Sequence, residues 1–546
     1  MKEPKWLTGL VLSIATSFLL LFSYPTYDVH VFGFFALIPI FFLAYTTNTK
    51  KTLVYGIVSG YLFYCLYLFW MNAYLAVVGV GFVTIVYGTY FVIALLLINL
   101  VSRALPRYRV LLTPFMWISI EFIRSFGFLG FTFGSLGYSQ HGFLPFIQIA
   151  DIGGEPLVSF IVVLFNASVA HVIVLLYERD WQIRSKLIAR GFIPFFVSLF
   201  LILASILYGY ARLKEPIPMK PSMKISLIQA LSSPRTKWKK EKWKTLNRLD
   251  MLSKESHKEH PDADLIVWTE TAIRTSLRPN LIYGSAYHTR IKRLINSLNT
   301  YFIIGSPDNY TIHNMQSLDT DKLNQIYPGK EEEEIWTNSA YFLDNTGEII
   351  DKYDKIQLTP FGEHFPLGQR IPLLQKILDN FTDSAGFTPG DEHTVFHYNN
   401  DFNFGVVICW EGTYGHFIRK YVKNGADFII NISNDMWTQT AAGHFQHFTI
   451  TKFRAIEHRM WFVRSANDGV TAFTNPHGEV VQSLPIKELG YLTDEIGPKV
   501  RTTFYTRFGD ILPTISLIVL GASFIFSIFL LSRKQARQRP VGKHKK

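Results

Sequence analysis

The apolar residues of this chain gather into long runs instead of spreading evenly along it. One apolar run follows another through residues 6–211, and a last run covers residues 511–531. Residues 223–507, between them, have the composition of an ordinary water-soluble domain. A helix that crosses a lipid bilayer needs about 20 apolar residues. The runs therefore predict membrane-spanning helices on both sides of one polar domain, and the low charged fraction of 18% agrees with lipid contact.

Eight of these runs are long enough to be spans. They cover residues 6–23, 29–46, 53–75, 77–101, 110–126, 156–177, 191–210 and 511–531. We therefore expect a membrane α-helical bundle of eight transmembrane helices, with seven of them in residues 1–215 and the eighth in residues 508–532. The polar domain then occupies residues 222–503.

Among the short loops between these runs, Lys and Arg occur only in alternate ones. Cytoplasmic loops carry the excess of these residues, so both termini are expected in the cytoplasm and the polar domain outside it. The tail, residues 533–546, carries seven Lys and Arg and is interpreted as a cytoplasmic topology signal, so no nucleic-acid partner is expected. The other basic positions that give the orientation, at the N-terminus and in the short loops, are Lys2, Lys5, Lys50, Lys51, Arg103, Arg107, Arg109, Arg179, Arg184, Lys186 and Arg190.

The chain has two cysteines, Cys65 and Cys409. Cys65 lies in the middle of a predicted span, so a disulfide with Cys409 would have to join the membrane to the polar domain. An unpaired thiol outside the cytoplasm is exposed to oxidation. Its presence at Cys409 therefore asks for a functional explanation.

The polar domain has the pattern of an α/β fold. Short apolar runs such as DLIVWTE, FGVVICWE and DFIINISND predict buried strands, and helix-like stretches separate them. Glu270, Cys409 and Asn434 stand at or just after the ends of such runs. Side chains in that position are delivered to the carboxyl edge of a sheet.

Three short signatures in this domain carry reactive side chains. Glu270 stands in IVWTET, Lys355 and Glu363 in YDKIQLTPFGEHFPLG, and Cys409 and Glu411 in VVICWEG. Each has an ordinary explanation when taken alone: a loop carboxylate, a surface lysine, a small buried hydrophobic residue. Their occurrence together in the order Glu, Lys, Cys is far more specific.

These residue types suit acyl transfer through a covalent intermediate. A thiol is mostly neutral at pH 7, so Cys409 needs a base, and Glu270 can accept its proton. Lys355 can face the oxyanion that forms when Cys409 attacks an acyl carbonyl, with the backbone N–H of Trp410 as a second donor. Glu363 can hold Lys355 in place.

The order of these signatures, with their flanking residues, resembles the nitrilase or carbon–nitrogen hydrolase superfamily. Together with WISIEFIRS, GFTFGSLGYSQ, ADIGGEPLVSF and GHFQHFTITKFRAIEHRMWFVRSANDGVTAF, nearly the whole chain resembles the apolipoprotein N-acyltransferase family. The resemblance implies a nitrilase-like αββα sandwich with Glu270 as general base, Lys355 as oxyanion stabiliser and Cys409 as nucleophile. It also implies accessory positions near the active site at Glu363, Glu411, Trp410 and Trp238.

The implied reaction has two halves and needs no cofactor. Cys409 takes an acyl chain from a membrane phospholipid as a thioester, and the α-amine of the diacylglyceryl-cysteine of an apolipoprotein then takes it as an amide. The enzyme is expected to be a monomer in the bacterial cytoplasmic (inner) membrane, with the catalytic domain on the periplasmic side. Two alternatives stay open: a membrane-anchored amidase or nitrilase-type hydrolase, and an inactive lipid-binding scaffold.

Several further positions are expectations of the same kind. The family commonly has Pro-Trp where this chain has Thr132 and Phe133, and Phe133 keeps an aromatic ring there. A metal is not expected, because His444 and His447 have no Cys or carboxylate cluster at ligand spacing. The residues expected to line the substrate cleft are Phe133, Phe361, Asn434 and Trp437.

Overall fold

The computed structural model describes residues 3–127, 129–177, 191–232, 238–277, 285–311, 334–360, 362–363 and 386–538. The chain divides into two compact units. One is helical and joins residues 1–215 to residues 503–546, and the other covers residues 216–502.

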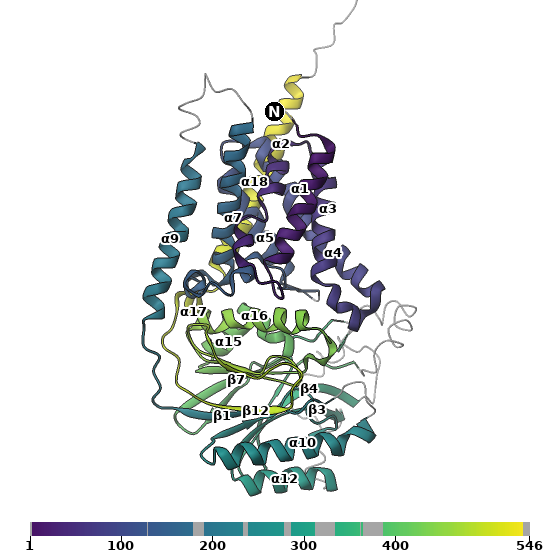
Figure 1. Ribbon diagram of the computed structural model, residues 1–546, viewed down its shortest axis with the longest axis vertical. Helices are drawn as coiled ribbons and strands as arrows, with labels where there is room; N and C mark the ends of the chain where they lie inside the picture. Colours follow the sequence, from purple (N-terminus) through teal and green to yellow (C-terminus); the bar gives the residue numbers. More distant parts are fainter. Residues whose placement is uncertain are drawn as a thin grey trace, which may run out of the picture. The chain divides into compact units, whose positions relative to one another are not determined.

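The helical unit is a bundle of long helices that run side by side (Figure 1). Helices that follow one another in the chain pack together, such as α3 on α4 and α5 on α7, while α18 returns from the end of the chain to pack on α5. The long helices are α1 (Trp6–Phe22), α2 (Ile38–Thr46), α3 (Thr49–Tyr67), α4 (Asn72–Ala104), α5 (Arg109–Arg124), α7 (Ala150–Tyr177), α9 (Ile193–Leu213) and α18 (Ile511–Gln538).

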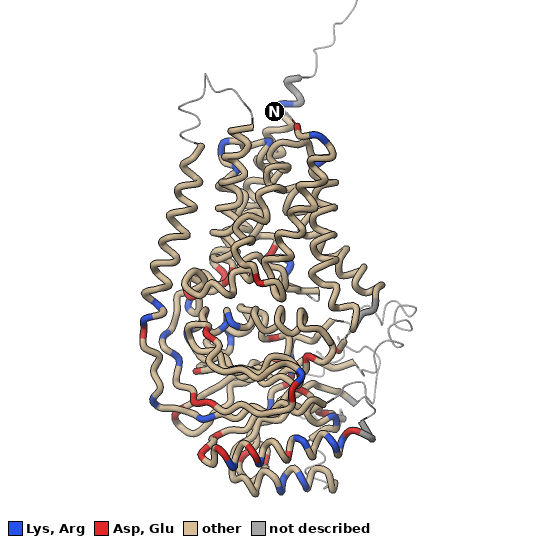
Figure 2. Tube along the Cα trace, viewed as in Figure 1, with Lys and Arg blue, Asp and Glu red and all other residues tan. Residues whose placement is uncertain are grey.

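Among the described residues, four helices of this unit are long and apolar enough to cross a membrane. They are Gly79–Ala104, Ala150–Tyr177, Ile193–Leu213 and Ile511–Lys534. The helix Trp6–Phe22 and the helical stretch His30–Thr46 are apolar but shorter. In Figure 2 the helices carry few charges along their length, and Lys and Arg gather at the end near the N-terminus.

Two predicted helix boundaries were wrong. The helices predicted for residues 53–75 and 77–101 meet earlier in the structure, because α3 ends at Tyr67 and α4 begins at Asn72. The short turn between them is as apolar as the helices, so hydropathy does not mark it. The run 29–46 is also not one helix: a 3-10 turn, His30–Phe34, precedes α2, whose first turn holds Pro39, where a missing N–H costs no hydrogen bond.

Polar side chains inside the helical unit fix the loop after α5. Glu121 accepts hydrogen bonds from Trp117 Nε1 and from the backbone N–H of Leu136, both at 2.8 Å. Arg124, three residues later on the same helix, donates to Ser135 Oγ at 2.9 Å. Phe133 is fully buried in this unit and stacks on Phe131 with ring centroids 4.9 Å apart.

The described residues of the polar unit form two six-stranded sheets with the orders β12-β1-β2-β3-β4-β5 and β11-β10-β9-β8-β7-β6. In the first sheet β1, β2 and β3 are parallel, and in the second β7, β8 and β9 are parallel. The strands are β1 (Met223–Gln229), β2 (Leu265–Val267), β3 (Tyr301–Thr311), β4 (Glu334–Leu343), β5 (Ile349–Asp354), β6 (Val395–Tyr398), β7 (Phe402–Ile408), β8 (Phe428–Ser433), β9 (Phe462–Ala466), β10 (Ala472–Thr474), β11 (Val480–Ser483) and β12 (Gly490–Ile496).

Helices cover the outer face of each sheet (Figure 1). Helices α10 (Trp238–Glu259) and α12 (Ala286–Leu298) lie over the first sheet, and α15 (Gly415–Lys423) and α16 (Ala441–His458) lie over the second. The sheets face each other through buried rings, since Phe342 of β4 lies 5.4 Å from Phe404 of β7 between ring centroids. These four layers confirm the predicted αββα sandwich.

Candidate active site

Glu270 lies three residues beyond the end of β2. Its side chain is buried, and the next residue, Thr271, has a φ of 49°, so the chain turns sharply after the glutamate. Its carboxylate accepts hydrogen bonds from Asn338 Nδ2 at 2.9 Å, Lys355 Nζ at 3.3 Å and the backbone N–H of Asn434 at 2.8 Å. Burial raises the pKa of Glu270, and the charge of Lys355 opposes that rise.

Lys355 directly follows β5 and is held between two carboxylates. Its Nζ lies 3.3 Å from Glu270 Oε1 and 2.8 Å from Glu363 Oε2, and the side chain is only 1% exposed. Burial opposes the charge on Lys355, but Glu363 and Glu270 outweigh burial and hold its pKa well above the usual range. The predicted grouping of Glu270, Lys355 and Glu363 is therefore present, with the lysine charged.

Asn338 joins the two glutamates and was not found from the sequence. It lies on β4, and its Nδ2 donates to Glu270 Oε1 at 2.9 Å and to Glu363 Oε1 at 2.6 Å. The backbone N–H of Lys355 donates to the carbonyl oxygen of Asn338 at 2.8 Å. A polar amide just before the apolar run AYFL, in the strand WTNSAYFL, was the available signal, since buried amides need partners.

Cys409 directly follows β7 and begins a 3-10 turn, Cys409–Thr413. Its φ is +54°, a left-handed conformation that residues other than glycine seldom adopt and that the surroundings must hold in place. Burial raises the pKa of the Cys409 thiol well above its usual range, the charge of Glu270 adds to the rise, and Lys355 opposes it. The resting thiol is therefore protonated, with a charged lysine and a carboxylate acting on it.

Glu411 ties the turn that carries Cys409 to the segment that carries Lys355. Its Oε2 accepts from the backbone N–H of Ile408 at 2.8 Å, and its Oε1 accepts from the N–H groups of Ile356 and Gln357 at 2.8 and 2.9 Å. Because these donors come from the two different sheets, one carboxylate fixes both strand ends against each other. Burial raises the pKa of Glu411 to about 7.

The other predicted positions divide into three groups. Trp410 is buried and donates its indole N–H to Tyr414 Oη, and Asn434 binds Glu270 only through its backbone N–H. Trp437 belongs to a 3-10 turn, Asp435–Trp437, just after Asn434. Phe361 and the side chain of Trp238 lie outside the described residues.

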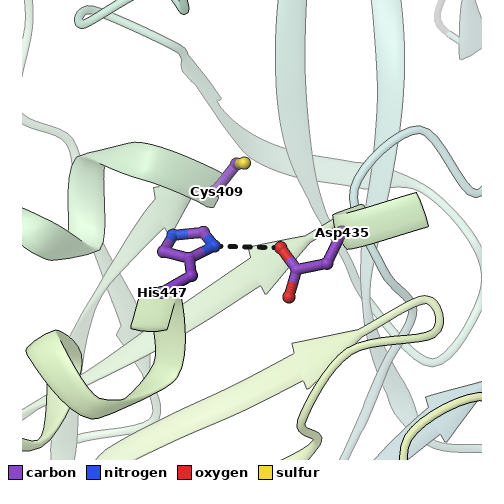
Figure 3. A group of neighbouring side chains, drawn as sticks. All are labelled: Cys409, Asp435 and His447. Carbon is purple, nitrogen blue, oxygen red and sulfur yellow. Dashed lines mark hydrogen bonds and ion pairs between the residues drawn. The ribbon is translucent and has the colours of Figure 1, made fainter. Parts of the chain in front are cut away.

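Cys409, Asp435 and His447 each offer a possible metal-ligand atom, and among the described residues these atoms lie within 4.8 Å of one another. Figure 3 shows His447 and Asp435 joined by a hydrogen bond, Nδ1 to Oδ1, of 3.0 Å. The guanidinium of Arg464 lies 2.7 Å from Asp435 Oδ2 and 3.1 Å from His447 Nδ1. The positive charge of Arg464 already pairs with the carboxylate of Asp435 and would repel a metal cation bound there. The expectation that the site holds no metal is not tested by this geometry and stays a prediction.

Known proteins resemble this chain over nearly its whole length. The family profile for the apolipoprotein N-acyltransferase N-terminal domain matches residues 16–168, and the profile for the carbon–nitrogen hydrolases matches residues 224–504. The apolipoprotein N-acyltransferase of Geobacter metallireducens is 28% identical over 514 residues, which cover 92% of this chain and 92% of that protein. Apolipoprotein N-acyltransferase 2 of Treponema denticola is 31% identical over 471 residues, covering 82% of this chain and 83% of that protein.

Among solved structures, the crystal structure of Saccharomyces cerevisiae Nit3, a member of branch 10 of the nitrilase superfamily, is 18% identical. The match covers 51% of this chain and 91% of that one, with a TM-score of 0.36. The hydrolase profile covers the polar unit, and the identity to the Treponema protein runs through both units. The chain therefore belongs to the apolipoprotein N-acyltransferase family, and its polar unit is a carbon–nitrogen hydrolase domain.

Proposed function

We propose that the protein moves an acyl chain from a membrane phospholipid to the α-amine of the diacylglyceryl-cysteine at the N-terminus of an apolipoprotein, through a thioester on Cys409. One observation supports this chemistry most directly. Cys409 lies on a left-handed turn where the charges of Glu270 and Lys355 both act on its thiol, and Lys355 is held by ion pairs with Glu270 and Glu363. The names of the relatives support N-acylation and the apolipoprotein acceptor, and the phospholipid donor is what the family resemblance of the sequence motifs implies.

The first half of the reaction acylates the enzyme. Because the resting thiol is protonated, Cys409 loses its proton to Glu270 as its sulfur attacks the ester carbonyl. The carbonyl oxygen becomes an oxyanion, and the ammonium of Lys355 stabilises it. When this intermediate collapses, the bond to the glycerol oxygen breaks, the proton passes from Glu270 to that oxygen, and a lysophospholipid leaves.

The second half uses the same groups in reverse. The neutral α-amine of the acceptor attacks the thioester carbonyl, and Lys355 again faces the oxyanion. The bond to sulfur breaks, the amide forms, and the proton lost by the amine returns to Cys409 through Glu270. Thioester to amide is downhill, so the reaction needs no cofactor.

The same triad could pass the acyl group to water instead, as in an amidase. The apolar helices and the relatives named as N-acyltransferases support an amine acceptor that is itself anchored in the membrane. The reactive side chains are all present, which speaks against an inactive scaffold.

The acyl-enzyme should accumulate when the purified protein receives radiolabelled phospholipid without an acceptor. We expect label on the protein that neutral hydroxylamine removes, since hydroxylamine cleaves thioesters, and transfer of that label when a diacylglyceryl peptide is added. Cys409→Ala should take up no label, whereas Cys65→Ala should behave like the parent protein. Free fatty acid as the main product with the peptide present would replace the transferase with a hydrolase.

Eight apolar helices are proposed to span the membrane, in an arrangement that leaves the termini in the cytoplasm and the carbon–nitrogen hydrolase domain outside it. The alternation of Lys and Arg between loops supports this orientation. Both substrates carry long acyl chains, so an enzyme anchored beside them needs no soluble carrier.

Two exposed positions test the orientation through labelling by a membrane-impermeant maleimide. In a protein with Cys65→Ala and Cys409→Ala, Met251→Cys should be labelled in spheroplasts, because Met251 is 42% exposed on α10. Arg107→Cys, on the exposed loop between α4 and α5, should be labelled only after the membrane is broken. The opposite pattern at these two sites would invert the topology.

A further inference from the structure

A second set of buried polar side chains lies next to Cys409 and has no role in the acyl-transfer steps proposed above. Asn431, Ser433, Asp435 and Arg464 are fully buried, and His447 is 1% exposed. Ion pairs lose solvation when they are buried, and apolar side chains would fill the same space at lower cost. The presence of this network next to Cys409 therefore points to a task other than packing.

Asn431 connects the network to the backbone of the nucleophile. It lies on β8, beside β7, and its Nδ2 donates to the carbonyl oxygens of Val407 and Cys409, each at 3.1 Å. Gly412 leaves room for this side chain, because a Cβ added there would lie 3.3 Å from the Asn431 amide. The Asn431 amide thus fixes one backbone carbonyl before Cys409 and the carbonyl of Cys409, the residue that has the left-handed conformation.

Arg464 and Asp435 fix the orientation of that amide. Arg464, on β9, donates through Nη1 to Asn431 Oδ1 and through Nη2 to Asp435 Oδ2, the latter at 2.7 Å. Asp435 Oδ1 accepts from Ser433 Oγ at 2.7 Å and from His447 Nδ1 at 3.0 Å. Because the Asn431 oxygen is bound to Arg464, only its NH2 group can face the two carbonyls.

We propose that Asn431, Arg464 and Asp435 form a positioning network that holds the carbonyls of Val407 and Cys409 and so maintains the left-handed turn that presents the Cys409 thiol. The inference rests on the proposed role of Cys409 as nucleophile. None of the three side chains acts on the substrate in this scheme. Their effect passes through the geometry and the electrostatic surroundings of the sulfur.

The sharpest variant is Asn431→Asp. The new carboxylate has the same shape and still accepts from Arg464, but it offers no donor to the two carbonyls. We expect kcat per folded molecule to fall about tenfold to a hundredfold, as for a misplaced reacting group, with KM for the phospholipid within about threefold. Arg464→Lys should lower kcat in the same direction, because a lysine keeps the charge but cannot bind Asn431 and Asp435 with one planar fork.

Alkylation of Cys409 by iodoacetamide gives a readout that a loss of folding alone would not change. In a Cys65→Ala background Cys409 is the one remaining thiol of the chain. Asn431→Asp should shift the midpoint of the rate against pH upward, since a carboxylate then stands beside the Cys409 backbone. Arg459→Lys is the matched control: Arg459 is also buried, but it donates to the carbonyl of Pro476 at 3.4 Å.

We expect the control to change thermal stability at most, and not the alkylation midpoint or kcat. The proposal is wrong if Asn431→Asp and Arg464→Lys, compared per folded molecule, both keep the parent's kcat and alkylation midpoint. If Asn431→Asp does not fold, Arg464→Lys alone decides through the same two measurements. Failure of the Cys65→Ala parent to transfer acyl chains would contradict the proposed function, and the alkylation profile would still report on the network.

Discussion

Replacing Glu270 with Gln should lower kcat about a hundredfold to ten-thousandfold, the range that a general base contributes. The carboxylate accepts from three donors, namely Asn338, Lys355 and the N–H of Asn434. Whichever way the Gln amide turns, its NH2 group meets a donor and cannot take the thiol proton. Single-turnover formation of the acyl-enzyme measures the effect directly, since it isolates the step in which Cys409 loses its proton.

The pH dependence of acyl-enzyme formation tests separately whether Glu270 acts as the base. Burial raises the pKa of Glu270, so the parent should lose activity as the pH falls through a value above that of an ordinary glutamate, which is about 4.3. Glu270→Gln should keep its small residual rate without this acidic limb. Asp308→Asn is the matched control, because Asp308 is a buried carboxylate that binds Lys352 at 3.0 Å on the same sheet. A full kcat in Glu270→Gln would remove the residue from the mechanism.

Glu270 and Cys409 could be predicted because each stands within three residues of the end of an apolar run, and a buried strand is visible in the sequence as such a run. Lys355 follows the mostly polar strand IIDKYD, so it was found through its signature with Glu363 instead. The αββα architecture follows from the same runs. A reactive residue at a strand end and the strand before it are neighbours in the sequence, so a single sequence is enough to find both.

The supporting residues could not be predicted because their partners are distant in the chain. Asn338 meets Glu270 across 68 positions, and Arg464 meets Asn431 across 33. Nothing near Asn338 in the sequence says which carboxylates it joins, since that depends on which strands become neighbours. The turn between α3 and α4 was missed for a different reason, namely that these two apolar helices and the turn between them are equally apolar.

The hydrogen bonds of Glu411 explain how residues from two sheets stay in register. The carboxylate accepts N–H groups on either side of the sandwich, beside Lys355 and beside Cys409. A shift of one sheet against the other would break these bonds before it could separate the lysine from the thiol. The sandwich core therefore supports the geometry of the triad as well as the stability of the domain.

Replacing Lys355 with Met should lower kcat about a hundredfold to a thousandfold, the loss expected when one oxyanion donor is removed. Met has nearly the same length and no charge, so the cavity stays filled while the oxyanion loses its cation. The change also leaves Glu270 and Glu363 beside each other with only Asn338 between them. Breaking a buried ion pair on one side costs about 3–5 kcal/mol, which should appear as a lower Tm.

The two carboxylates also predict how the remaining activity responds to pH. In the parent the charge of Lys355 lowers the pKa of both glutamates against the effect of burial. Without that charge they share a proton more readily, so the acidic limb of kcat should move to higher pH in Lys355→Met. Adding base should then recover part of the lost rate, because an ionised Glu270 can again accept the thiol proton.

Lys352→Met separates these effects from the general loss of a lysine. Lys352 lies three residues earlier on β5 and also binds two carboxylates, Asp308 at 3.0 Å and Asp354 at 2.8 Å, neither of which belongs to the group around Lys355. It should lower Tm while leaving kcat and the acidic limb unchanged. An equal fall of kcat in both variants would mean that Lys355 acts through folding alone, whereas a loss confined to Lys355→Met, with its limb at higher pH, ties the cation to both the oxyanion and the base.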